Sequence, residues 1–286
     1  MEFRHIVPED KTEYEKHYKY KYRIASDASF ATAYAWAEGY GTTVLFQNDV
    51  ACLKGKSDSP SPYFMMPVGP GDRTKFIKSL YDYCHDMNIM FSLHWALKED
   101  IPFIENLFGD KVKIVSSRDS ADYIYETASL LTLSGKKLHA KRNHVNAFKA
   151  KYTFDIAGIS KSNMDAVCAF VLQHCKTEEE KHAMIRMFSN YFQLNLVGMI
   201  LYVDHHVVAV TVGEKITEDT ALIHLEKADI SYQGAYPAVN QLFVSNFFAD
   251  TRYINREEDM GIEGLRKAKL SYHPAFLLEK FTVTEA

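Results

Sequence analysis

The chain has 286 residues, of which 47% are hydrophobic and 24% are charged, so it can bury a core and is not low-complexity. Its net charge of −4 argues against a general DNA or RNA binder, because such proteins are usually basic. Four cysteines without a Cys-x-x-Cys pair exclude a disulfide framework. The sequence shows no signal peptide and no apolar run long enough to span a bilayer. It therefore predicts a cytoplasmic protein whose contact with a membrane, if any, is peripheral.

The first half of the chain predicts a series of short elements in a fixed order. Ser26 or Asp27 is expected to cap a first helix, and Asp72 a second helix over 73–87. Alternating apolar residues predict a hairpin over 43–53 and strands over 63–66 and 89–95. A loop rich in Ser and Pro over 57–62 separates the hairpin from the next strand.

The second half repeats this order. Two amphipathic helices, around 167–171 and 184–192, precede a hairpin over 201–212, a strand over 221–225 and a Gly-containing break over 232–236. A helix from Pro237 to about 248, a strand at 253–254, a helix over 261–269 and a final strand over 276–283 complete the series. We therefore expect two similar α/β domains in tandem, 1–130 and 131–286, each with a mixed, largely antiparallel sheet flanked by helices.

The order of predicted elements in the second half is that of the acetyltransferase-like fold. Specific sequence motifs support the same assignment. They are Asp122-Tyr-Ile-Tyr125, Lys141-Arg-Asn143, Glu226-Lys-Ala-Asp229, Tyr232-Gln-Gly-Ala-Tyr236 and the segment 253–274. With them the chain resembles an uncharacterised bacterial branch of the phosphatidylglycerol lysyltransferase C-terminal domain family. The resemblance implies two tandem acetyltransferase-like (GNAT) domains.

The family also implies a chemistry. Its named relatives transfer an aminoacyl group from charged tRNA to a lipid, and Fem-type relatives transfer it to a peptidoglycan precursor. The implied donor is an aminoacyl-tRNA or an acyl-CoA, with no permanently bound cofactor. The chain departs from the lipid enzymes in having no membrane-spanning region. It also lacks the Gln/Arg-x-x-Gly-x-Gly/Ala loop of CoA-dependent acetyltransferases, and Gln233-Gly-Ala235 takes that place with different spacing.

Two segments are candidates for binding the phosphates of a donor. Residues 127–154 contain no Asp or Glu but carry several basic side chains, which phosphate attracts. The break at 232–236 leads into a helix whose N–H groups suit an anion. The donor-binding candidates are Lys136, Lys137, Lys141, Arg142, Tyr232, Gly234, Tyr236 and Asn240. The competing interpretations are a solvated helix face and a plain turn.

Carboxylates and their neighbours supply the catalytic candidates. Glu226 ends the strand that usually faces the acyl group in this fold, and a carboxylate there can accept a proton from an attacking amine. A polar cluster follows the strand at 253–254, in the kind of loop that often carries function. From it, Glu257 and Asn255 join Glu226 as catalytic candidates, and the substrate-binding candidates are Arg256, Asp259, Arg266, Lys269 and Tyr272. A structural ion network is the competing interpretation, and His205-His206 lacks the ligand spacing of a metal site.

The sequence thus predicts a transferase that moves an acyl group from charged tRNA or acyl-CoA to an amine or hydroxyl acceptor. Its partners would be a small-molecule or tRNA donor and no DNA, and the oligomeric state is left open. The alternative is a non-catalytic protein of the same fold that binds a nucleotide, an RNA or a phospholipid headgroup.

Overall fold

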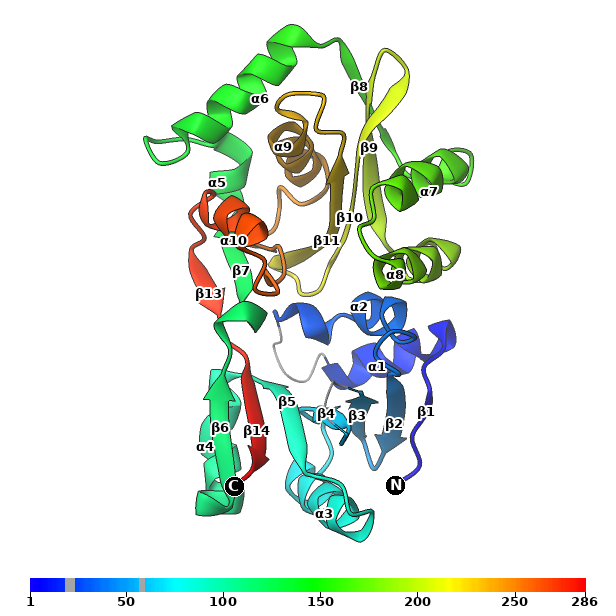
Figure 1. Cartoon of the computed structure of the whole chain (residues 1–286), viewed down its shortest axis with the longest axis vertical. Helices are drawn as coiled ribbons and strands as arrows, with labels where there is room; N and C mark the ends of the chain where they lie inside the picture. The colour runs from blue at the N-terminus through cyan, green and yellow to red at the C-terminus, as the bar shows by residue number, and fades with distance from the viewer. Residues whose placement is uncertain (19–23, 57–59) are drawn as a thin grey trace. The chain divides into compact units, whose positions relative to one another are not determined.

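The computed structural model describes residues 1–18, 24–56 and 60–286, so part of the loop predicted at 57–62 lies outside the described residues. The chain forms two compact units (Figure 1). Unit 1 comprises Met1–Arg23, Asp27–Ala121 and Glu279–Ala286, and unit 2 comprises Ile24–Ser26 and Asp122–Leu278. Among the described helices, none combines the length and apolar character needed to cross a membrane.

Unit 1 is built on one mixed sheet whose described strands run in the order β1-β2-β3-β4-β5-β14-β6. Only β4 and β5 pair in parallel; the other neighbours are antiparallel. Its core gathers around Phe64, Ile77, Leu80 and Leu93. The elements are β1 (Arg4–His5), α1 (Lys11–Tyr18), α2 (Phe30–Ala35), β2 (Thr43–Gln47), β3 (Val50–Gly55), β4 (Tyr63–Met65), α3 (Arg73–Asp86), β5 (Ser92–Ala96), α4 (Ile101–Phe108), β6 (Val112–Ser116) and β14 (Phe281–Glu285).

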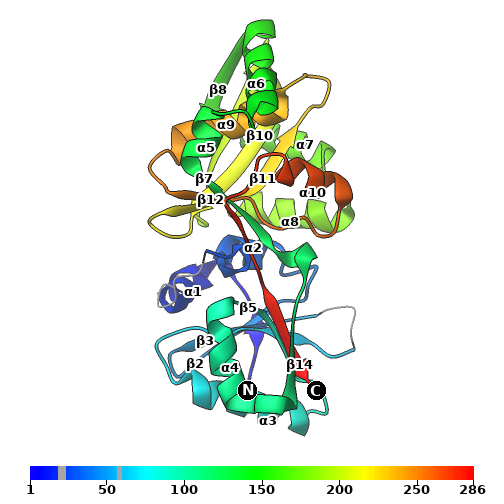
Figure 2. The same cartoon turned by 90° about the vertical axis from the view of Figure 1, so that its left-hand side faces the viewer.

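Unit 2 has a second mixed sheet, in the order β13-β7-β12-β11-β10-β9-β8. Helix α9 packs on β10 and β11 and is itself covered by α5 and α6 (Figure 2). The elements are β7 (Asp122–Glu126), α5 (Thr127–Thr132), α6 (His139–Lys151), β8 (Phe154–Gly158), α7 (Met164–Gln173), α8 (Glu178–Ser189), β9 (Val197–Val203), β10 (His206–Lys215), β11 (Thr220–Ala228), α9 (Ala235–Phe247), β12 (Tyr253–Asn255), α10 (Glu263–Leu270) and β13 (Phe276–Leu278).

The two sheets have the same plan, with three antiparallel pairings, one parallel pairing and two more antiparallel pairings. In this plan β7 takes the place in unit 2 that β14 takes in unit 1. Along the chain, β7 follows β6 of unit 1, and β14 follows β13 of unit 2. Two tandem domains of mixed sheet and helices are therefore confirmed, with the strand next to the edge exchanged between them.

Several boundaries differ from the predicted ones. The final strand expected over 276–283 is two strands, because the chain leaves one sheet after Leu278 and enters the other at Phe281. The chain passes from unit 1 to unit 2 after Ala121 and comes back to unit 1 at Glu279. The predicted domains were 1–130 and 131–286. Helix α2 is capped by Ser29, whose side chain accepts the Thr32 N–H, and not by Ser26 or Asp27.

Candidate functional site

Strands β11 and β12 of unit 2 separate after a short parallel pairing. They pair only at Thr220↔Tyr253, Ala221↔Ile254 and Leu222↔Asn255, while β11 continues to Ala228. A bulge accompanies the separation, because Val212 of β10 faces Leu225 whereas its neighbour Gly213 faces Ile223. The edge of β11 over 223–228 therefore has no described strand beside it on the β12 side.

Glu226 lies on this part of β11, and its carboxylate accepts hydrogen bonds from two residues. Asn240 of α9 donates to Oε1 of Glu226 at 2.8 Å, and Arg256 donates to Oε2 from Nε at 2.9 Å and from Nη2 at 2.5 Å. Thr211 of β10 stands opposite Glu226 in the ladder. The Glu226 and Arg256 side chains are only 12% and 13% exposed, so this is a largely buried ion pair with two-point geometry.

Three polar atoms beside this pair are buried without a hydrogen-bond partner. They are Oγ1 of Thr211, Oδ1 of Asn240 and Nη1 of Arg256. A buried polar atom that makes no hydrogen bond costs about 1–3 kcal/mol, so native structures seldom leave several together. Their position around one carboxylate is typical of a site completed by a bound polar group or by water.

Aromatic rings and a second cation adjoin Arg256. Its guanidinium carbon lies 4.7 Å from the ring centre of Tyr272 and 5.7 Å from that of Tyr125, and Nζ of Lys141 lies 4.2 Å from the Tyr272 ring. Burial and the nearby Arg256 charge lower the pKa of Lys141. Burial raises the pKa of Tyr272 to about 12 although the Arg256 charge acts against it. The surroundings of Arg256 therefore carry excess positive charge, which favours an electron-rich ligand group.

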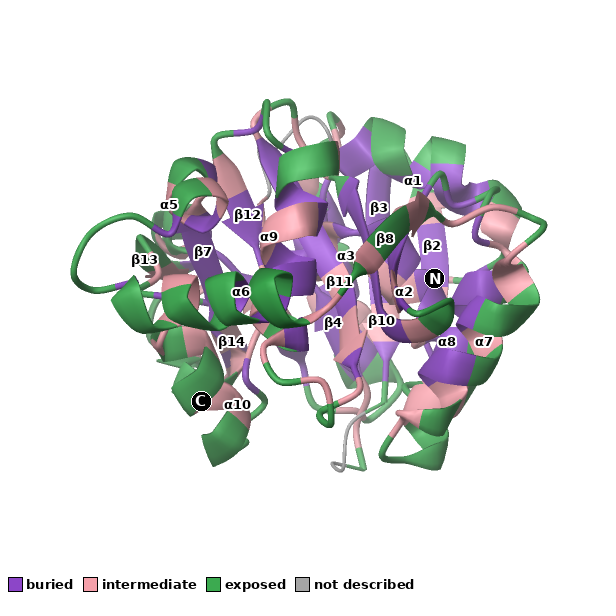
Figure 3. Ribbon diagram, turned by 90° about the horizontal axis from the view of Figure 1, so that it is seen from above, coloured by how far each residue is buried: buried purple, intermediate pink, exposed green. Residues whose placement is uncertain are grey.

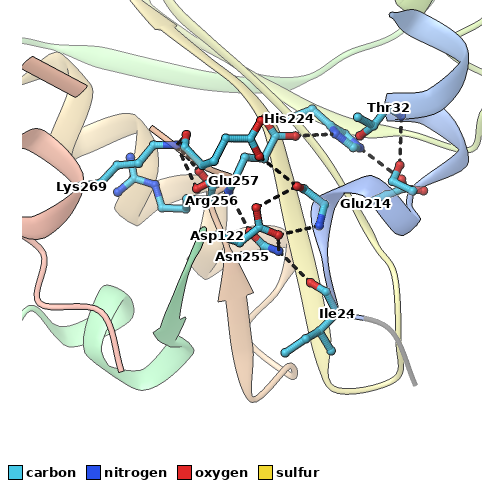
Figure 4. A network of polar contacts seen from close by, with 12 residues as sticks. Ile24, Thr32, Asp122, Glu214, His224, Asn255, Arg256, Glu257 and Lys269 are labelled. Carbon is cyan, nitrogen blue, oxygen red and sulfur yellow. Dashed lines mark hydrogen bonds and ion pairs between the residues drawn. The ribbon is translucent and has the colours of Figure 1, made fainter. Parts of the chain in front are cut away.

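A buried histidine lies between two carboxylates at the bulge. Nδ1 of His224 is 3.3 Å from Oε1 of Glu257, and Nε2 is 3.2 Å from Oε1 of Glu214 (Figure 4). The His224 side chain is 2% exposed, and that of Glu257 is 28% exposed. Burial lowers the pKa of His224, but the two carboxylates outweigh it and raise the pKa to about 9. His224 is therefore an imidazolium at neutral pH, and Glu257 is the more accessible of its two partners.

The turn that presents Glu257 is fixed by Asn255 and Lys269. Oδ1 of Asn255 accepts the Glu257 N–H at 2.7 Å, and its Nδ2 donates to Asp122 Oδ2 at 2.9 Å and to the Ile24 carbonyl at 2.7 Å. Nζ of Lys269 donates to the carbonyls of residues 256, 257 and 258 at 2.5, 3.1 and 2.5 Å. The polar groups of Asn255 and Lys269 are thus engaged within the protein.

Asp259 and Arg266 brace the start of the next helix. Arg266 donates to both carboxylate oxygens of Asp259, at 2.8 and 2.7 Å, and the Tyr123 hydroxyl donates to the same carboxylate at 2.5 Å. The Arg266 hydrogen bonds, helped by Tyr123 and the Gly261 N–H, hold the pKa of Asp259 well below its usual range despite burial. This arrangement anchors α10 to β7.

The candidates for phosphate binding lie mostly apart from this cluster. A Cβ on Gly234 would stand 2.5 Å from the His144 carbonyl, so Gly234 allows α9 to begin directly against α6. Arg142 donates to the Leu133 carbonyl at 2.5 Å and caps the end of α5. Lys136, Lys137 and Tyr236 are exposed, while Tyr232 packs on the Tyr152 ring. Figure 3 shows the outer turns of α6 exposed.

The structure thus brings together Glu226, Asn240, Arg256, Tyr272 and Lys141. Around the adjoining turn it gathers Asn255, Glu257, Lys269 and the missed residues Glu214 and His224. A lone histidine in an otherwise apolar strand was a visible signal for His224. Thr211 had no such signal, because a threonine is ordinary in a strand.

Comparison with known proteins shows the family to which the chain belongs. The family model described as "Phosphatidylglycerol lysyltransferase, C-terminal" matches residues 20–284. A conserved protein of unknown function from Bacteroides thetaiotaomicron is 32% identical, with 99% of each chain covered and a TM-score of 0.94. The uncharacterized protein MYCGA3080 of Mycoplasmoides gallisepticum is 24% identical over 198 residues; the match covers 63% of this chain and 64% of that relative.

More distant solved structures share the fold alone. The C-terminal domain of a putative lysylphosphatidylglycerol synthetase from Agrobacterium fabrum has a TM-score of 0.70 at 12% identity, covering 98% of this chain and 91% of that chain. FemX and a tandem GNAT protein of clavulanic acid biosynthesis have TM-scores of 0.63 and 0.52 at 8% and 10% identity, each covering 99% of this chain and 97% and 98% of their own. The predicted acetyltransferase-like fold is therefore confirmed.

Proposed function

Because the chain belongs to the phosphatidylglycerol lysyltransferase C-terminal family, we propose that it transfers an acyl or aminoacyl group to an amine or hydroxyl acceptor. Charged tRNA and acyl-CoA are the donors that this proposal admits, and both are available in the cytoplasm. The reaction would take place in unit 2, which holds the Glu226 cluster.

The observation that carries the proposal is the separation of β11 from β12 beside the Glu226–Arg256 pair. An extended donor can pair with the edge of β11 beyond Leu222, where no described strand lies on the β12 side, as a peptide adds to a sheet. N–H groups on that edge can also stabilise the oxyanion that develops on the acyl carbonyl. The three unsatisfied atoms of Thr211, Asn240 and Arg256 supply hydrogen bonds for a polar substrate group.

Glu257 is the carboxylate best suited to accept the acceptor's proton. Both oxygens of Glu226 already accept hydrogen bonds from protein donors, whereas Glu257 is more exposed. With an amine acceptor, the ammonium proton passes to Glu257 and the nitrogen bonds to the acyl carbon. The bond from that carbon to the donor's oxygen or sulfur breaks, and the second amine proton goes to the leaving atom.

The test is transfer of radiolabel by the purified full chain, with each aminoacyl-tRNA and with short and long acyl-CoA donors against amine and hydroxyl acceptors. We expect turnover with one donor class and a fall on the order of a hundredfold for Glu257→Gln. Glu226→Gln should weaken substrate binding, because it breaks the pair with Arg256. Glu263→Gln, an exposed change on α10, serves as the control.

One result would decide against the role of Glu257, and another against transfer itself. Turnover that is unchanged in Glu257→Gln would remove Glu257 from the reaction. Saturable binding of a tRNA, a nucleotide or phospholipid vesicles without transfer from any donor would instead favour the non-catalytic binding protein.

A further inference from the structure

The geometry points to Asn255 and Lys269 as positioning residues that hold Glu257 in a strained turn and so fix its carboxylate beside His224. This inference rests on the proposed function for the role of Glu257, but the positioning itself can be measured without turnover. It gives Lys269, whose sequence context suggested a substrate ligand, a role that acts through another residue.

The turn between β12 and α10 departs from ordinary backbone conformation. Glu257 has φ 58° and Met260 has φ 52°, both in the left-handed region. Glutamate has no special tolerance for this region, unlike glycine or asparagine, so the surrounding structure must impose it. Non-glycine residues in such conformations gather at functional sites.

Lys269 supplies one part of that constraint. An ammonium has three N–H donors, and all three are accounted for by the three consecutive carbonyls of residues 256–258. Three successive carbonyls converge on one point only when the backbone curls around it, so the ammonium and the left-handed residue require each other. The ammonium lies largely out of water among these carbonyls, and this burial lowers the pKa of Lys269.

Asn255 supplies the other part. Its Oδ1 accepts the Glu257 N–H, and its Nδ2 is fixed by the buried carboxylate of Asp122. Asp122 in turn accepts hydrogen bonds from the N–H and hydroxyl of Ser26, at 2.7 and 2.9 Å. Asn255 is 0% exposed, so it has one position available. The turn is therefore fixed by Asn255 at its start and by the Lys269 ammonium, which its carbonyls surround.

The consequence of the turn is the divergence of two neighbouring side chains. Arg256 reaches Glu226. Glu257 reaches His224 (Figure 4). Relaxing residue 257 to an extended conformation would redirect its side chain and remove a carboxylate from His224. Lys269 lies on α10, which has no buried residue of its own, so this ammonium also fixes the helix.

The experiment combines Lys269→Met with Glu257→Gly in a double-mutant cycle, because glycine adopts the left-handed conformation without strain. Melting of the full chain should show a large drop in Tm for Lys269→Met in the wild-type background and a smaller drop in the Glu257→Gly background. Lys267→Met, an exposed neighbour on α10, should change neither. Equal drops in both backgrounds would overturn the inference.

A second measurement follows Glu257 through His224. The His224 ring signals should titrate at lower pH in Lys269→Met than in the wild type, as they should in Glu257→Gln, because one carboxylate has left. An unchanged His224 titration in a folded Lys269→Met protein would show that Lys269 only stabilises the fold. Where transfer is detected, kcat should fall on the order of a hundredfold with KM little changed. Absence of transfer in the wild type would refute the proposed function and leave both measurements standing.

Discussion

His224 should make the stability of unit 2 depend on pH in a defined window. Its carboxylate partners raise its pKa to about 9, whereas an unfolded chain leaves histidine near its ordinary value of about 6.5. A raised pKa in the folded state means that the proton binds more tightly there. The stabilisation is therefore complete below about pH 6.5 and is lost as the pH rises through about 9.

The magnitude follows from that difference. About 2.5 pH units, at about 1.36 kcal/mol each, correspond to about 3 kcal/mol of unfolding free energy. The side chain is 2% exposed, so solvent screens its two ion pairs little. This is a substantial fraction of the 5–15 kcal/mol or so that holds a typical domain folded.

The assay is urea unfolding of the wild type and His224→Gln between pH 6 and 10, followed by a probe in unit 2. The wild type should be the more stable protein at pH 6.5, and the gap should shrink by about 3 kcal/mol by pH 10. His182→Gln, which changes an exposed histidine of the same unit, controls for the loss of an imidazole. A gap that is independent of pH, or one that closes near pH 6.5, would refute the assigned environment.

Two further substitutions test the packing around the site. Gly234→Ala should destabilise unit 2 by about 1–3 kcal/mol in thermal melting, because φ is 87° and the added Cβ would meet the His144 carbonyl; Gly264→Ala, with nothing within 4 Å, should be neutral or mildly stabilising. Thr211→Val removes a buried hydroxyl that has no partner, so stability should stay the same or rise by about 1 kcal/mol while substrate binding weakens; a clear loss of stability would mean that the hydroxyl is already satisfied.

Local patterns predicted the elements well. The hairpins now seen as β2–β3 and β9–β10 were predicted because alternation and turn residues act over a few positions. The strand exchange was not, because β7 and β14 read like any other strand and their partners are decided by contacts distant in sequence. The predicted single strand over 276–283 failed for the same reason.

The sequence named several residues that the structure brings together, but it did not indicate how they are arranged. Motif positions named Glu226, Asn240 and Arg256, and in the structure Asn240 and Arg256 both donate hydrogen bonds to Glu226. His224 was missed because its significance depends on the bulge that turns it between two carboxylates, and a bulge leaves little trace in sequence. Lys269 was predicted to bind substrate because a lysine in a polar segment suggests an exposed charge. In the structure its ammonium donates hydrogen bonds to three backbone carbonyls.

Each unit has a left-handed residue close to the end of its parallel strand pairing, and different side chains surround the two residues. In unit 1, β5 pairs in parallel with β4 as far as His94, and the next residue, Trp95, has φ 58°. Trp95 lies inside β5, and its ring centre is 5.0 Å from that of Tyr63 and 5.5 Å from that of His94, so aromatic contacts surround it. In unit 2 the turn after β12 holds Glu257 at the same φ, but it is filled by an ammonium and faces an imidazolium. A left-handed residue close to the end of the parallel pairing therefore occurs in both units, so this backbone conformation alone does not indicate chemistry; what distinguishes Glu257 is the polar groups that surround it.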